Sequence, residues 1–262
     1  MLIDTHCHLD AVEFAADWTE VLDAARAAGV GAFVVPAVSL DSCAAVRDLA
    51  YSTPDCLPAY GLHPLYLTGG TPDTLLALRD FVAVEMRGPR PPVAIGETGL
   101  DYFLPGTDAA WQKEFFLAQL RLAREFDLPV IVHVRRAVDD VIACLRRVRV
   151  RGGIAHAFNG SRQQAEALVG LGFKLGFGGS MTYAGSRSIR RLAAELPLAE
   201  IVLETDAPDI PPYWQPQGRC EPVFLARYAE VLAGLRGLSV AEIARATAQN
   251  AAQLLGGVDD SC

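Results

Sequence analysis

The sequence predicts an α/β fold in which eight parallel strands, each followed by a helix, close into one (β/α)8 or TIM barrel. Three observations lead to this prediction. Short apolar runs recur along the chain, an amphipathic segment of helical periodicity follows most of them, and about eight such units fit into 262 residues. Nearly continuous hydrophobic strands that alternate with helices are typical of a parallel sheet covered by helices, and barrels of roughly 250 residues are common.

The expected strands are eight short apolar segments. They span residues 1–4, 31–38, 57–63, 92–98, 129–134, 152–158, 173–179 and 201–206. The expected helices are amphipathic segments between these strands, with two final helices that pack outside the barrel. They include residues 18–29, 72–86, 110–126, 136–148, 161–172, 186–196, 222–236 and 239–255. Gly29 and Gly172 end two of these helices, because glycine tolerates the positive φ of a helix stop.

An open, doubly wound sheet is the alternative to a closed barrel. Against it, the first strand leads into DTHCHLD, residues 4–10, and not into a glycine-rich dinucleotide-binding turn. We see no linker long enough to divide the chain, so we predict a single domain over residues 1–262. The proline-rich segment 207–222 follows the eighth strand and is expected to form a loop at the active site, the alternative being a long connection.

The composition narrows the class of protein. A formal net charge of −8 argues against wrapping of nucleic acid, which needs a basic surface, but it allows a phosphate substrate whose charge is met locally. The chain shows no secretory signal and no apolar run of membrane-spanning length. The cysteines form no C-x-x-C pair and do not suggest a disulfide framework; they are Cys7, Cys43, Cys56, Cys144, Cys220 and Cys262. We therefore expect a cytoplasmic protein in a reducing compartment, with no membrane association and no obligate protein partner.

Polar residues that bind metals stand at the ends of the predicted strands. His6 and His8 follow the first strand with one residue between them, so both side chains point the same way in an extended segment. The same pattern also occurs at ordinary strand ends. The remaining residues at strand ends are His63, Glu97, His133, His156 and Asp206. All strand carboxyl ends of a parallel barrel meet at one mouth, so we expect these side chains to converge there and, apart from His63, to bind metal.

Six segments carry a resemblance to a known family. In chain order they are IDTHCHLD, GLHP, IGETGLDYF, LPVIVHVRRA, AHAFNGS and LETDAPDIPP. They resemble the TatD family of metal-dependent deoxyribonucleases, within the amidohydrolase superfamily, from residue 3 to about 222. The resemblance implies two divalent ions. It places His6, His8 and Asp206 on one ion, His133 and His156 on the other, and Glu97 between the two.

The donor types agree with such a centre. Imidazoles with two carboxylates suit zinc or manganese better than magnesium, although all three stay candidates. The expected reaction is hydrolysis of a phosphodiester by a water bound between the ions, with Asp206 as the base and Glu97 as the bridge. DNA or another phosphoester is the expected substrate, and the resemblance favours an exonuclease. The sequence itself leaves endonuclease action and RNA as a substrate open.

Other residues are expected near the substrate. We assign His63 to a phosphate oxygen or to the support of the ligands, the alternative being a turn histidine, and Arg135 to phosphate. Aromatic side chains in the predicted loops could stack on bases or simply pack their own loops; they are Tyr66, Tyr102, Phe103, Tyr213 and Trp214. Asn159 and Cys220 depart from the common family pattern, in loops that shape access of the substrate.

Two other functions compete with a deoxyribonuclease. The first is an amidohydrolase-type enzyme that acts on a small phosphoester, amide or lactone. Many such barrels bridge their metals with a modified lysine on the fourth strand, where this chain has Glu97 and no lysine. The second is a barrel that binds metal or a partner without turnover, which a full set of ligands with an available base disfavours.

Overall fold

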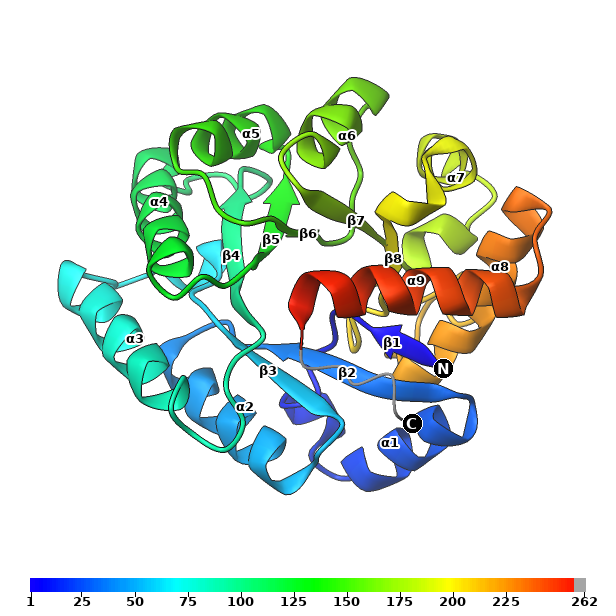
Figure 1. Cartoon of the computed structure of the whole chain (residues 1–262), viewed down its shortest axis with the longest axis horizontal. Coiled ribbons are helices and arrows are strands. Elements are labelled where there is room, and N and C mark those ends of the chain that lie inside the picture. The colour runs from blue at the N-terminus through cyan, green and yellow to red at the C-terminus, as the bar shows by residue number, and fades with distance from the viewer. Residues whose placement is uncertain (257–262) are drawn as a thin grey trace.

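The structure is a computed structural model that describes residues 1–256, and in it eight parallel strands follow one another around a barrel (Figure 1). The strands pair in chain order from β1 to β8. They are β1 (Leu2–Asp4), β2 (Val30–Pro36), β3 (Cys56–Tyr60), β4 (Ala94–Asp101), β5 (Val130–Arg135), β6 (Gly153–Ala155), β7 (Phe173–Phe177) and β8 (Ile201–Leu203). The predicted α/β barrel is therefore confirmed. The prediction of a single domain over residues 1–262 stays a prediction, because residues 257–262 lie outside the described residues.

The barrel closes between its first and last strands. Just past β1, Thr5 N donates a hydrogen bond to Leu203 O (3.1 Å), and Asp206 N donates to His6 O (2.8 Å). These bonds continue the ladder beyond the named strands. They also tie together two backbone segments that are about two hundred residues apart and carry candidate metal ligands.

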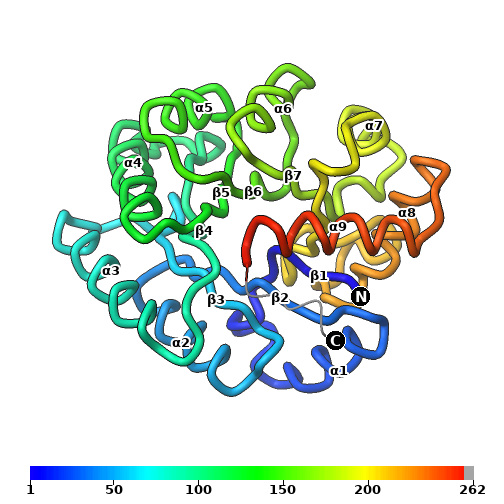
Figure 2. The backbone as a smooth tube through the Cα atoms, viewed as in Figure 1, coloured from blue at the N-terminus to red at the C-terminus, as the bar shows by residue number. Residues whose placement is uncertain are grey.

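Helices surround the strands as predicted (Figure 2). They are α1 (Trp18–Ala27), α2 (Leu40–Ser52), α3 (Pro72–Glu85), α4 (Ala109–Glu125), α5 (Val138–Arg147), α6 (Arg162–Val169), α7 (Arg187–Glu195), α8 (Leu225–Arg236) and α9 (Val240–Leu255). Helix α2 was not among the expected segments. The side chain of Ser39 caps it by accepting from Ser42 N (3.2 Å), which satisfies one of the free N–H groups of its first turn.

Two apolar layers hold the barrel together. Inside it, alternate strand residues such as Val34, Ile131 and Val202 form one buried cluster, while the residues between them face the helices. Helix α9 crosses the amino-terminal end of the barrel (Figure 1), where Ala251 and Leu255 join the inner cluster. This end is thus filled with apolar side chains, and polar chemistry is left to the opposite end.

Strand ends differ from the predicted ones where polar residues begin. β6 stops at Ala155 and β8 at Leu203, because His156 and Asp206 lie in the segments that turn into the mouth. β4 instead continues to Asp101, since it pairs with β5 as far as Arg135. Gly99 permits this close pairing: its φ is 149°, and a Cβ there would lie 2.0 Å from His133 O.

The remaining general predictions concern cysteines and membranes. Within residues 1–256 the cysteines are free and buried; they are Cys7, Cys43, Cys56, Cys144 and Cys220. Cys262 lies outside the described residues. None of the helices that the structure describes is long and apolar enough to cross a membrane.

Candidate metal centre

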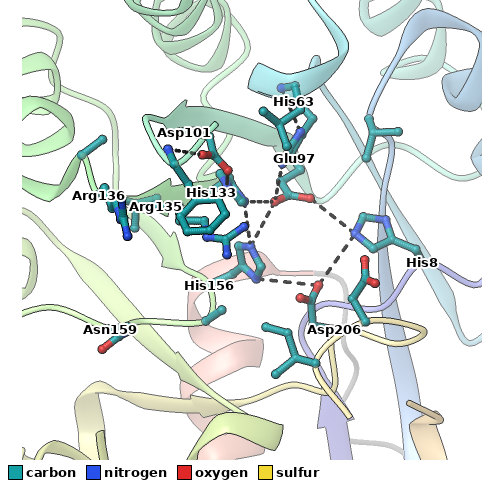
Figure 3. Close-up of a pocket in the computed structure, with 18 of the residues that line it drawn as sticks. His8, His63, Glu97, Asp101, His133, Arg135, Arg136, His156, Asn159 and Asp206 are labelled. Atoms are coloured by element: carbon teal, nitrogen blue, oxygen red, sulfur yellow. Dashed lines mark hydrogen bonds and ion pairs between the residues drawn. The ribbon is translucent and has the colours of Figure 1, made fainter. Parts of the chain in front are cut away.

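A pocket of about 1500 Å³ opens at the carboxyl ends of the strands. Figure 3 shows its polar residues, which come from β1, β3, β4, β5, β6, β8 and the segments after them. Backbone strain is concentrated in the same place. Within residues 1–256, five residues other than glycine have positive φ, and four of them line this pocket; they are Arg136, Ala157, Asp206 and Ile210. Such conformations cost about 1–3 kcal/mol each and tend to occur at functional sites.

The carboxylate of Glu97 lies at the centre of the histidines. Its Oε2 is 3.2 Å from His6 Nε2 and 3.4 Å from His8 Nε2. Its Oε1 is 3.0 Å from His133 Nδ1, 3.0 Å from His156 Nε2 and 3.5 Å from His63 Nε2. All five histidines of the chain therefore contact one buried carboxylate.

Three donor atoms gather near Glu97 Oε2 and form a group of four with it. His6 Nε2 lies 3.1 Å from His8 Nε2 and 3.5 Å from Asp206 Oδ1, and His8 Nε2 lies 3.9 Å from the same oxygen. Donors of a tetrahedral site with metal bonds of about 2.0–2.1 Å are about 3.3–3.4 Å apart. The spacing of these nitrogens and oxygens therefore suits one transition-metal ion.

A second group of donor atoms lies on the Oε1 side of Glu97. His156 Nε2 is 3.4 Å from His133 Nδ1, and both nitrogens face Glu97 Oε1. His63 also approaches this oxygen, so its ring, Glu97 and His133 together make a further possible metal-binding group. The residues present can thus hold cations on both sides of a shared carboxylate.

The other ring nitrogen of three histidines faces an acceptor. His8 Nδ1 lies 3.2 Å from Pro36 O, and His133 Nε2 lies 2.9 Å from Asp101 Oδ2. His156 Nδ1 points toward Glu204 Oε1 but, at 3.7 Å, forms no hydrogen bond with it. A ring that donates its proton outward presents an unprotonated nitrogen inward, which is how histidine ligands are oriented in metal sites.

His63 has the opposite arrangement. Leu65 N donates to His63 Nδ1 (3.2 Å), so the neutral ring carries its proton on Nε2, the atom that faces Glu97. Burial lowers the pKa of His63 to about 4, which keeps the ring neutral. This geometry makes His63 a hydrogen-bond donor toward the centre and not an additional ligand.

The charges in the centre attract cations. Burial raises the pKa of Glu97, but the surrounding histidines reverse this and hold it well below the usual range. Burial lowers the pKa of His8, yet Glu97 and Asp206 raise it to about 9. Burial also raises the pKa of Asp206 to about 7. Without metal, protons thus occupy some of the donor atoms that a metal ion would need.

We therefore expect metal affinity to increase as the pH rises. Below pH 7 both His8 and Asp206 hold protons that must leave when an ion binds, and His8 still holds its proton up to about pH 9. Each displaced proton changes the apparent affinity by about tenfold per pH unit. Calorimetric titration of zinc in buffers of different ionisation enthalpy measures both the affinity and the protons released. An affinity that is constant from pH 6 to 9 would contradict the prediction.

Sequence reasoning missed three buried acids that support the centre. Asp101 contacts His133, and Glu204 accepts a hydrogen bond from Ala157 N and approaches His156. Asp4 accepts from Thr205 N (2.9 Å) and Thr205 Oγ1 (2.6 Å) and thereby fixes the junction of β1 and β8. The period of two along a strand relates Asp101 to Glu97 and Glu204 to Asp206, so strand alternation was the available signal.

Asp101→Asn is expected to lower kcat/KM about 10- to 100-fold, because the amide no longer fixes the ring of His133 as the carboxylate does. The measurement is kcat/KM together with the metal content of the purified protein. Asp140→Asn is the matched control, since Asp140 lines the same pocket but pairs with Lys113 at 2.9 Å. Equal losses in the two variants would show that Asp101 has no special role.

The remaining predicted residues fall into two groups. Arg135, Tyr66, Tyr102, Phe103 and Asn159 line the pocket. Others lie elsewhere: Tyr213 borders a separate groove with Tyr183, and Trp214 packs against Phe224 and Tyr228. Cys220 is buried with its Sγ 3.3 Å from Tyr228 Oη. Asn159 is therefore the family departure that lies in the pocket.

Comparisons with known proteins agree with the motifs. The family model for TatD related DNase matches residues 3–256. The uncharacterized metal-dependent hydrolase YjjV of Escherichia coli (strain K12) is 42% identical over 251 residues, 95% of this chain and 95% of the relative. The crystal structure of YjjV has a TM-score of 0.93 at 40% identity, covering 97% of each chain. The 3′-5′ ssDNA/RNA exonuclease TatD of Erwinia tasmaniensis is 32% identical over 261 residues, 97% of this chain and 99% of the relative. The chain belongs to the TatD related DNase family of metal-dependent hydrolases.

Proposed function

We propose that this protein hydrolyses phosphodiester bonds in DNA at a centre of two divalent ions. The observation that carries the proposal is the contact of Glu97 with all five histidines, because one carboxylate then joins two groups of donor atoms. The proposal also draws on the exonuclease named among the relatives.

The proposed ligands follow the two sides of Glu97. His6, His8 and Asp206 would hold one ion and His133 and His156 the other, with Glu97 between the two groups. Zinc or manganese suits these donors best. Two divalent ions bring a charge of +4, and Glu97 and Asp206 bring −2, so the loaded centre has a charge of +2 that favours an anionic phosphodiester.

Ions at this centre would lower the pKa of a bound water and stabilise the charge that develops on the phosphate. Asp206, whose Oδ1 lies between His6 and His156, would serve as the base that accepts a proton from that water. When substrate binds, a phosphate oxygen replaces Glu97 as the partner of His63. The Nε2–H group of His63 then donates a hydrogen bond to that oxygen. His6, Glu97 and His156 are buried, which keeps bulk water away from the contacts between them.

The experiment is digestion of end-labelled oligonucleotides by protein stripped of metal and reloaded with zinc, manganese or magnesium. We expect no cleavage by the stripped protein, restored cleavage after reloading, and a one-nucleotide ladder from a single end if the enzyme is an exonuclease. Hydrolysis of small phosphoesters, lactones or amides without any cleavage of DNA would favour the amidohydrolase-type alternative. Inactivity on all of these substrates would reject the enzyme function.

A cytoplasmic location stays a prediction from the sequence and is part of this proposal. A fraction of the native protein that sediments with membranes or leaves the cell would contradict it.

A further inference from the structure

Two arginines at the mouth of the pocket have no role in the centre described above. Arg135 and Arg136 end β5 and begin the following loop, and both side chains are exposed. Figure 3 shows them grouped beyond His133, on the side of the pocket away from His8 and Asp206. β5 rises about 3.3 Å per residue, so the Cα of Arg135 lies about 7 Å further out along the strand than that of His133.

Both guanidinium groups are held against one aromatic ring. The Cζ of Arg135 lies 3.5 Å from the centroid of the Phe103 ring, and that of Arg136 lies 4.7 Å from it. Arg136 has a φ of 56°, a strained conformation for a residue with a side chain. Within residues 1–256 neither guanidinium forms an ion pair or a side-chain hydrogen bond. The fold therefore brings two cations together without giving them a partner.

The rest of the pocket is acidic. Its lining includes eight carboxylates, and Arg135 and Arg136 are the two arginines in it. Glu97 and Asp206 would be neutralised by bound ions, and Asp101 and Asp140 have the partners His133 and Lys113. A polyanion that enters this mouth is repelled by the other acids, so the arginine pair is the place where a second phosphate is favoured.

We propose that Arg135 and Arg136, held by Phe103, form a second anion subsite that binds a phosphate next to the one that is cleaved. This inference rests on the proposed hydrolysis of phosphodiesters and extends it. The pair lies on one side of the centre, so it favours one direction of the strand across the pocket. Planar guanidinium groups suit a phosphate because each can donate two parallel hydrogen bonds.

The first test measures binding without catalysis. Thymidine 5′-monophosphate is titrated into metal-free protein in the presence of a chelator, and the wild type is compared with the Arg135→Gln, Arg136→Gln double variant. We expect the double variant to bind about 10- to 100-fold more weakly. Arg121→Gln is the control, since Arg121 is exposed on α4 and also forms no ion pair within the described part of the chain. Unchanged binding in the double variant would reject the subsite.

The second test uses substrates that differ by one phosphate. Thymidine dinucleotides with no terminal phosphate, a 5′-phosphate or a 3′-phosphate are compared with bis(4-nitrophenyl) phosphate, which has a single phosphate. The wild type should prefer one of the two phosphorylated dinucleotides through a lower KM, and the double variant should lose that preference. An equal loss on all four substrates would place the arginines at the cleaved phosphate and overturn the proposal, as would a preference that survives in the double variant.

These two tests separate the inference from the proposed function. If the wild type cleaves none of the four substrates, the proposed phosphodiesterase fails, and the binding comparison alone decides whether the arginines bind phosphate. Phe103→Leu gives an independent check, because it keeps the apolar contact but removes the ring face that orients both guanidinium groups. It should weaken nucleotide binding less than the double variant does, and unchanged binding would contradict the role of Phe103.

Discussion

Replacing Glu97 by Gln is expected to abolish hydrolysis, with a fall in kcat of at least about 10³-fold. The carboxylate joins both donor groups, with its Oε2 near His6 and His8 and its Oε1 near the other three histidines. A neutral amide keeps the size of the side chain but loses the charge that attracts two cations. The amide also places an N–H₂ group beside one of the two groups of donor atoms, where a carboxylate oxygen is needed to bind a cation.

Metal content distinguishes this effect from general damage. We expect Glu97→Gln to retain fewer ions per chain than the wild type by mass spectrometry of the metals. Glu85→Gln is the matched control, because Glu85 is also a buried glutamate but contacts Tyr51 on the outside of the barrel. Full activity in Glu97→Gln, or the same loss of metal in both variants, would show that the centre has been placed wrongly.

The second large effect is expected for Asp206→Asn, which should lower kcat by about 10²- to 10⁴-fold, the usual contribution of a general base. The amide oxygen can still lie near His6, so we expect most of the metal to remain bound. A loss of activity with metal retained would therefore separate the role of Asp206 in proton transfer from its role as a ligand.

The measurement is kcat on a DNA oligonucleotide together with the metal content of each preparation. Asp209→Asn serves as the control, since Asp209 is exposed at the same mouth and belongs to neither donor group. Wild-type kcat in Asp206→Asn would exclude Asp206 as the base. Loss of all metal in this variant would leave it as a ligand only.

The sequence by itself determined the order of strands and helices and the identity of the polar residues at the mouth. Hydrophobic runs specify strands because each buried strand must face apolar neighbours, and the barrel rule then places every strand end at one rim. The same rule places His6, His133 and Asp206 on one face of the molecule. Family motifs added the expected grouping of the residues around Glu97.

Only the tertiary structure decided what each polar atom contacts. The role of His63 depends on the N–H of Leu65, and a backbone donor two residues away is invisible in a pattern of residue types. The contact of Asp101 with His133 depends on the pairing of β4 with β5 as far as Arg135. Distances of a few ångströms between distant segments set the orientation and tautomer of each histidine ring and the stacking of the guanidinium groups on Phe103. Sequence patterns report only which face of a helix or strand a residue occupies.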